Sequence, residues 1–159
     1  MTPTSYQTIF EITQKGFTWW FAFAGFIPGI VGLALLYWRK RHEASGRIKY
    51  LSYFFPAFTL IWLFGVTIPM WRGYERVNAA YRSGNFSIVE GPVEDFRPMP
   101  PQGHTCESFR VQTATFCYGD DTISAGFNND TQHGGPIRAG MQVRIAYVGD
   151  NILRIEAMK

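Results

Sequence analysis

Histidine and cysteine, the side chains best suited to binding a soft metal ion, are few in this sequence. His104, Cys106 and His133, with Asp130 nearby, could present imidazole, thiolate and carboxylate ligands to zinc or copper. Neither a His-x-Cys sequence nor a single histidine before two glycines is a specific metal-binding spacing. A metal- or redox-responsive module built on these residues is therefore an alternative interpretation, and the sequence favours no resident metal and no cofactor.

The two cysteines, Cys106 and Cys117, lie near opposite ends of one predicted strand over residues 107–118. In a fully extended strand they would be about 35 Å apart, whereas a disulfide requires Cα atoms within about 7 Å. Only a strong bend at a bulge would bring them together. We expect two buried, small apolar side chains rather than an internal bridge.

Catalytic motifs are missing from the sequence. Ser108 and Ser124 lie in no G-x-S-x-G or S-x-x-K pattern, and neither a P-loop nor a G-x-G-x-x-G loop occurs. Glu94 and Asp95 would point to opposite faces of a strand. The sequence therefore predicts a protein that is not an enzyme.

Two long uncharged segments, residues 17–38 and 51–71, dominate the N-terminal half. At about 1.5 Å per residue, each would span about 30 Å as a helix, which is the thickness of the hydrocarbon core of a bilayer. Aromatic residues occur at the ends of both segments, as in the aromatic belts of membrane proteins. The first segment is too long for a signal peptide. The positive cluster also lies after this segment, whereas a signal peptide carries its positive charge before the apolar stretch. We expect two transmembrane helices.

The segment between these helices, residues 39–50, carries the positive excess of the chain. It contains five basic residues and only one acidic residue, whereas residues 72–159 contain nine basic and ten acidic residues. A short basic loop stays cytoplasmic, so the cluster sets the topology and is not a nucleic-acid site. The topology residues are Arg39, Lys40, Arg41, Arg47 and Lys49.

This topology predicts a multi-pass protein of a bacterial inner membrane with both termini extracytoplasmic. Residues 1–16 would be a short extracytoplasmic tail, residues 72–84 a juxtamembrane linker helix, and residues 85–159 an extracytoplasmic domain. Its net charge of −1 excludes nucleic-acid binding by this domain.

Small residues fall near one face of the first membrane helix, at Gly25, Gly29 and Gly32. Glycines at this spacing let two helices approach closely. We favour packing against the second helix of the same chain over homo-oligomerisation. A third interpretation makes this face a buried interface in a transporter or secretion assembly.

Beyond residue 84 the pattern changes to short strands, over residues 86–96, 107–118, 122–127, 141–148 and 152–158. The Gly91–Pro92 pair predicts a bulge or bend, and "YGDD" predicts a hairpin turn. Five antiparallel strands in so short a domain favour a small barrel, OB-like or SH3-like. The predicted fold class is therefore a two-helix transmembrane hairpin followed by a five-stranded β-barrel.

The C-terminal sequence "GGPIRAGMQVRIAYVGDNILRIEAMK" contains a glycine, an alternating V-R-I strand, a G-D/N turn and an L-R-I-E strand. This pattern resembles the closing hairpin of the OB domain in bacterial NfeD-type membrane proteins. The resemblance implies a barrel that docks onto other membrane-associated proteins and does not catalyse a reaction.

Alternating strand directions place two long loops, residues 97–106 and 128–137, at the membrane-distal end of this barrel. Binding residues often lie on loops held by a rigid scaffold. We therefore expect a non-catalytic accessory or scaffolding protein that contacts the lipid bilayer and docks another membrane or envelope protein. The candidate contact residues are Arg97, His104, Asn128, Asn129, Asp130 and His133.

Overall fold

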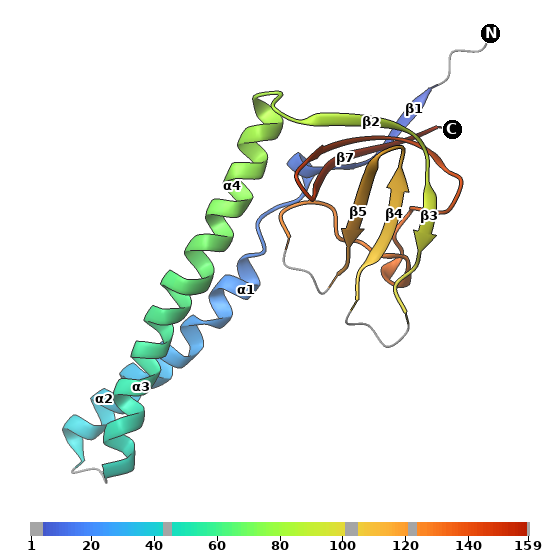
Figure 1. Ribbon diagram of the computed structural model, residues 1–159. Helices are drawn as coiled ribbons and strands as arrows, with labels where there is room; N and C mark the ends of the chain where they lie inside the picture. Colours follow the sequence, from blue (N-terminus) through green and yellow to red (C-terminus); the bar gives the residue numbers. More distant parts are fainter. Residues whose placement is uncertain (1–4, 43–45, 101–104, 121–123, 159) are drawn as a thin grey trace. The chain divides into compact units, whose positions relative to one another are not determined.

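The computed structural model describes residues 5–42, 46–100, 105–120 and 124–158 (Figure 1). The chain divides into two compact units. The helical unit is Phe17–Gly73, and the β unit combines Met1–Gly16 with Tyr74–Lys159. The boundary between the units falls within helix α4 (Ile68–Arg82).

Two continuous helical segments carry the apolar sequence of the chain. Trp19–Arg41 comprises α1 (Trp19–Ala24) and α2 (Phe26–Arg41), and Gly46–Arg82 comprises α3 (Gly46–Trp62), the π-helical turn η2 (Leu63–Thr67) and α4. With 23 and 37 residues, both are long and apolar enough to cross a membrane. Many of their large apolar side chains are exposed, whereas a core helix of a soluble protein would bury them.

Helices α2 and α3 pack against each other (Figure 1). The three glycines of the first segment face residues of α3 at this contact. A Cβ atom at Gly25 would lie 1.9 Å from Trp62 Cδ1, and one at Gly32 would lie 2.3 Å from Pro56 Cδ. At Gly29 the facing residue is Thr59, whose hydroxyl donates a 3.0 Å hydrogen bond to the carbonyl oxygen of Gly25. The structure thus places the glycine face against the second helix of the same chain.

Basic residues occur on both sides of the connection between α2 and α3. The last turn of α2 contains three of them, where cations interact favourably with the helix dipole. One of these, Arg39, donates hydrogen bonds to Ser52 Oγ at 3.3 Å and to the Tyr53 hydroxyl at 3.1 Å, which ties the two helices together. The cluster consists of Arg39, Lys40 and Arg41 in α2 with Arg47 and Lys49 in α3.

The β unit contains two antiparallel sheets (Figure 1). Sheet A has the order β1-β7-β6-β2, and sheet B has the order β3-β4-β5. The strands of sheet A are β1 (Tyr6–Glu11), β7 (Asn151–Met158), β6 (Gln142–Val148) and β2 (Ser87–Pro92). The strands of sheet B are β3 (Glu94–Arg97), β4 (Glu107–Val111) and β5 (Ala114–Tyr118).

The chain passes from sheet A to sheet B between β2 and β3, with Val93 alone between the strands. The backbone N–H of Val93 donates to the carbonyl oxygen of Met141, and the carbonyl oxygen of Val93 accepts from the backbone N–H of Gly140, both at 2.9 Å. The bend predicted from Gly91–Pro92 is therefore present at this corner. It lets both sheets contribute side chains to one core.

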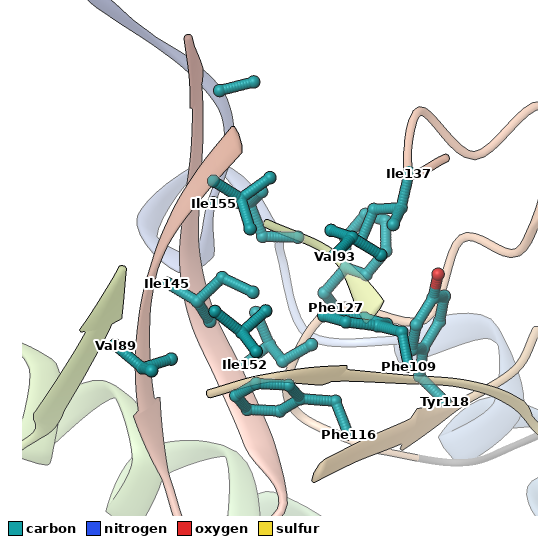
Figure 2. Close-up of a cluster of buried hydrophobic side chains, with 13 residues drawn as sticks. Val89, Val93, Phe109, Phe116, Tyr118, Phe127, Ile137, Ile145, Ile152 and Ile155 are labelled. Carbon is teal, nitrogen blue, oxygen red and sulfur yellow. The ribbon is translucent and has the colours of Figure 1, made fainter. Parts of the chain in front are cut away.

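Buried aromatic and branched aliphatic side chains fill the space between the two sheets (Figure 2). Sheet A contributes residues such as Ile145 and Ile155, and sheet B contributes Phe109 and Phe116. A second buried cluster on the other face of sheet A joins Ala146 and Leu153 to Val77 of α4 and to Ile12. Sheet A is therefore covered on both faces.

The predicted antiparallel strands are present, but the small five-stranded barrel is not: the strands form one four-stranded and one three-stranded sheet that do not close into a barrel. Residues 6–11, within the predicted N-terminal tail, form β1 and pair with β7, so that β1 is an edge strand of sheet A as β5 is of sheet B. Phe127 packs in the core against a side chain from each of these strands, with its ring centroid 5.1 Å from those of Phe10 in β1 and Tyr118 in β5.

The predicted single strand over residues 107–118 is also wrong, because the chain reverses at Gln112 and Thr113 to form the β4–β5 hairpin. Gln112 has a positive φ of 52°, a conformation usually occupied by glycine, asparagine or aspartate in such turns. Its side-chain amide donates a 2.7 Å hydrogen bond to the carbonyl oxygen of Glu90 in β2. Residues 124–127, predicted as a strand, are not in a strand.

Candidate functional site

Strand β5 is one of the two edge strands of sheet B, the other being β3. Strands β4 and β5 form five residue pairs, and the pair Val111–Ala114 closes the two-residue turn. In such a hairpin the closing pair and every second pair from it exchange the ladder hydrogen bonds. The N–H and C=O groups of Thr115 and Cys117 therefore point away from β4. In the described part of the chain, β5 pairs with β4 alone.

Side chains on β5 alternate between the core and the surface. Phe116 and Tyr118 are buried in the core, where Tyr118 lies beside Phe109 and Phe127 (Figure 2). Thr115 and Cys117 are exposed. The same two residues thus combine exposed side chains with outward backbone groups that have no strand partner in the described part of the chain.

Cys106 and Cys117 form a disulfide with a Cα–Cα distance of 5.5 Å, and the prediction of two unbridged, buried cysteines is wrong. The error follows from the missed hairpin. Glu107 is paired with Tyr118, and Ser108 with Cys117, so the two cysteines lie diagonally across adjacent strands. Cys117 is exposed and Cys106 is half-buried. A disulfide is typical of an extracytoplasmic domain.

A buried carboxylate, Glu107, lies next to the disulfide in sequence and faces the core. It accepts hydrogen bonds from the Tyr118 hydroxyl and from both the backbone N–H and the hydroxyl of Thr131. Burial, together with the hydrogen bond to Glu107, raises the pKa of Tyr118 above its ordinary value. The network joins β4, β5 and the short helix η3 (Thr131–His133).

Asp130, a predicted partner contact, is instead a buried cap of η3. One carboxylate oxygen accepts from the backbone N–H of His133 at 3.0 Å and lies 2.8 Å from His133 Nδ1. The other oxygen accepts from the backbone N–H of Asp120 at 3.2 Å. Burial alone would raise the pKa of Asp130, but the hydrogen bonds from His133 and Asp120 outweigh it and lower that pKa.

The remaining predicted contact residues differ in exposure and in hydrogen bonding. Arg97 is exposed at the end of β3, Asn129 and His133 are exposed, and His104 lies outside the described residues. Asn128 is half-buried, and its side-chain oxygen accepts a 3.0 Å hydrogen bond from Lys15. Asn128 therefore holds the N-terminal segment in place.

Lys15 is a structural residue that the sequence pattern did not indicate. Its ammonium group donates to the carbonyl oxygens of Gly126, at 2.6 Å, and Ser124, at 3.4 Å, as well as to Asn128. Burial lowers the pKa of Lys15, and the negative charge of Asp120 opposes this effect. Lys15 thereby fixes the segment that carries Phe127.

The alternative metal site loses its thiolate in this structure, because the Cys106 sulfur is bonded to Cys117. Among the described residues, no group of three or more His, Cys, Asp or Glu side chains is arranged to hold a metal ion. The candidate site is the exposed disulfide on the edge strand β5. On the core side, the buried carboxylates of Glu107 and Asp130 hold the neighbouring segments by hydrogen bonds.

No family model, curated protein or solved structure matches the chain. The resemblance of the C-terminal hairpin to NfeD-type proteins stays a prediction.

Proposed function

We propose that this protein is a non-catalytic accessory or scaffolding protein of a bacterial inner membrane, whose outward-facing β unit docks a partner protein. The observation that carries the proposal is the open edge of β5, where Thr115 and Cys117 present backbone donors and acceptors without a strand partner in the described structure. Such groups are satisfied best by another extended backbone. The partner is therefore an extended segment of another envelope or membrane protein, added as a strand beside β5.

The anchor and the orientation support this proposal. Two helices long and apolar enough to cross a membrane precede most of the β unit, and the positive charge is concentrated at their connection. Short basic connections stay on the cytoplasmic side, which supports an orientation with both termini outside. The disulfide agrees with that compartment.

The glycine face is less suited to a partner, because it already contacts the second helix of the same chain. This arrangement argues against Gly25 and Gly29 as the interface of a transporter or secretion assembly. Sheet B, in contrast, has an edge at β5 to which an additional strand can pair.

Thr115→Pro tests the proposal. Proline removes the outward N–H at this position but leaves the β4–β5 ladder bonds, since proline is tolerated on the free side of an edge strand. Thr115→Val is the matched control, because it keeps the N–H and a branched side chain. Both variants should keep the disulfide and the thermal stability of the full-length protein.

The readout is partner recovery after affinity purification in mild detergent from cross-linked cells. We expect a protein that copurifies with the natural chain and with Thr115→Val to be lost with Thr115→Pro. Equal recovery with all three chains, or no copurifying protein with any of them, would reject docking at this edge.

A further inference from the structure

We infer that the Cys106–Cys117 disulfide is a thiol–disulfide exchange site whose reaction partner is a protein dithiol. The first reason is access. Cys117 is exposed and Cys106 is half-buried, whereas the aromatic side chains next to Cys117 on β5 are buried in the core. An attacking thiolate must approach a disulfide sulfur directly, so access limits the rate of exchange.

The second reason is that the hairpin carrying the disulfide has other supports. Strands β4 and β5 share five residue pairs, and Phe109, Phe116 and Tyr118 anchor them in the core. On the core side of the same end of the hairpin, Glu107 binds Tyr118 and Thr131. Reduction therefore removes one cross-link without removing the packing and the buried hydrogen bonds that hold the two strands together.

The third reason is the position of Cys117 on the open edge. Its outward N–H and C=O groups lie beside the sulfur, so an incoming chain in extended conformation can align with β5 while its thiolate approaches. The exchange reaction requires the accessible disulfide and not the docking edge. It therefore goes beyond the proposed scaffolding function and can be tested separately.

The reaction has two balanced steps. A thiolate of the dithiol attacks Cys117 Sγ, the Cys106–Cys117 bond breaks, and Cys106 leaves as a thiolate that takes a proton from water. The second thiol of the partner, after losing its proton, attacks the partner sulfur of the mixed disulfide, and Cys117 leaves as a thiolate and is protonated. The chain gains two electrons and two protons, and the dithiol becomes a disulfide.

The first experiment uses dithiothreitol as the dithiol and the full-length protein in detergent. Free thiols are trapped with N-ethylmaleimide at successive times and counted by mass spectrometry, while protease resistance reports the fold. We expect the rate to increase in proportion to dithiothreitol concentration and to lie within about tenfold of the rate in denaturant, because access limits exchange. The reduced β unit should stay folded.

Two results would overturn this inference. A rate that does not depend on dithiothreitol concentration would show that unfolding must precede reduction, and loss of protease resistance on reduction would show a purely structural disulfide. The variant Thr115→Pro should exchange at the natural rate, so that failure of docking and failure of exchange give different patterns.

Two single-cysteine variants test which sulfur is attacked. In Cys106→Ser only Cys117 remains, and in the matched Cys117→Ser only Cys106 remains. With glutathione disulfide, we expect Cys117 to form the mixed disulfide faster than Cys106, after correction for the thiolate fraction of each. Equal rates, or a faster Cys106, would overturn the assignment of Cys117 as the reacting sulfur.

Discussion

At the scale of single residues, two buried carboxylates determine the structure around η3. Glu107 and Asp130 are both fully buried, and each accepts hydrogen bonds from more than one donor. A buried carboxylate without such donors would be strongly destabilising. Asp130 appeared in the sequence as a contact residue because it lies in a polar loop, but its side chain organises that loop from within.

Replacing Asp130 by asparagine should lower the free energy of unfolding of the β unit by about 1–3 kcal/mol at pH 7, because an amide nitrogen would replace one of the two buried acceptors. The pKa of Asp130 is lowered from 3.8 in the folded chain. Its contribution to stability is therefore present above pH 3.8 and is lost as pH falls through the lower, folded-state pKa. Denaturant titrations between pH 7 and pH 2 should show the difference between the two chains shrinking below pH 3.8.

The control for this variant is Asp150→Asn, in the exposed turn between β6 and β7. It should unfold as the natural chain does throughout the titration. A difference between Asp130→Asn and the natural chain that stays constant down to pH 2 would contradict the role given to the Asp130 charge.

At the scale of secondary-structure elements, close contact between α2 and α3 depends on residues without a side chain. Gly32 faces the ring of Pro56, which cannot move away by a change of rotamer. At Gly73, in α4, a Cβ atom would have no neighbour within 4 Å among the described residues, apart from the adjoining residues and backbone of its own helix. The two positions therefore allow the packing role of a helical glycine to be separated from its effect on helix propensity.

We expect Gly32→Ala to destabilise the helical unit by about 1–3 kcal/mol through overpacking against Pro56. Gly73→Ala should stabilise its helix by about 0.5–1 kcal/mol, because alanine loses less backbone freedom on folding. Thermal unfolding of the full-length protein in detergent, followed by circular dichroism, measures both. A lower melting temperature for Gly32→Ala and a higher one for Gly73→Ala would support the packing role of Gly32. Equal changes in melting temperature would contradict it.

At the scale of the whole molecule, the distribution of charge and the disulfide both support the proposed topology. The basic residues cluster at the α2–α3 connection, while the disulfide lies in the β unit. The first indicates a cytoplasmic connection and the second an extracytoplasmic domain. These two arguments are independent, since one concerns membrane insertion and the other concerns redox chemistry.

Single cysteines introduced at two exposed positions, His42→Cys and Asp150→Cys, test this topology. The native disulfide does not react with maleimides, so it can remain in place. In cells with a permeabilised outer membrane, an impermeant maleimide should label Asp150→Cys at once and His42→Cys only after lysis. The reverse labelling pattern would show that the chain is inserted in the opposite orientation.

The sequence by itself determined the features that are written in consecutive residues. The two uncharged segments, the basic connection and the bend at Gly91–Pro92 depend on composition and local backbone preference. The change from helical to strand patterning after residue 84 is local in the same sense, and the structure has antiparallel sheets there. Such signals do not depend on what the segment contacts.

Only the tertiary structure decided the features that join distant residues. Glutamine is not a residue type that usually takes a positive φ in a hairpin turn. Gln112 does so here, and its side chain donates a hydrogen bond to the carbonyl oxygen of Glu90 in another strand. That turn brings Cys117 to Cys106 and leaves β5 as an edge. Likewise, β1 pairs with β7 from the other end of the chain, and Phe127 packs against Phe10 of β1 and Tyr118 of β5. Long-range packing selected these arrangements over the local preference for one continuous strand and a closed barrel.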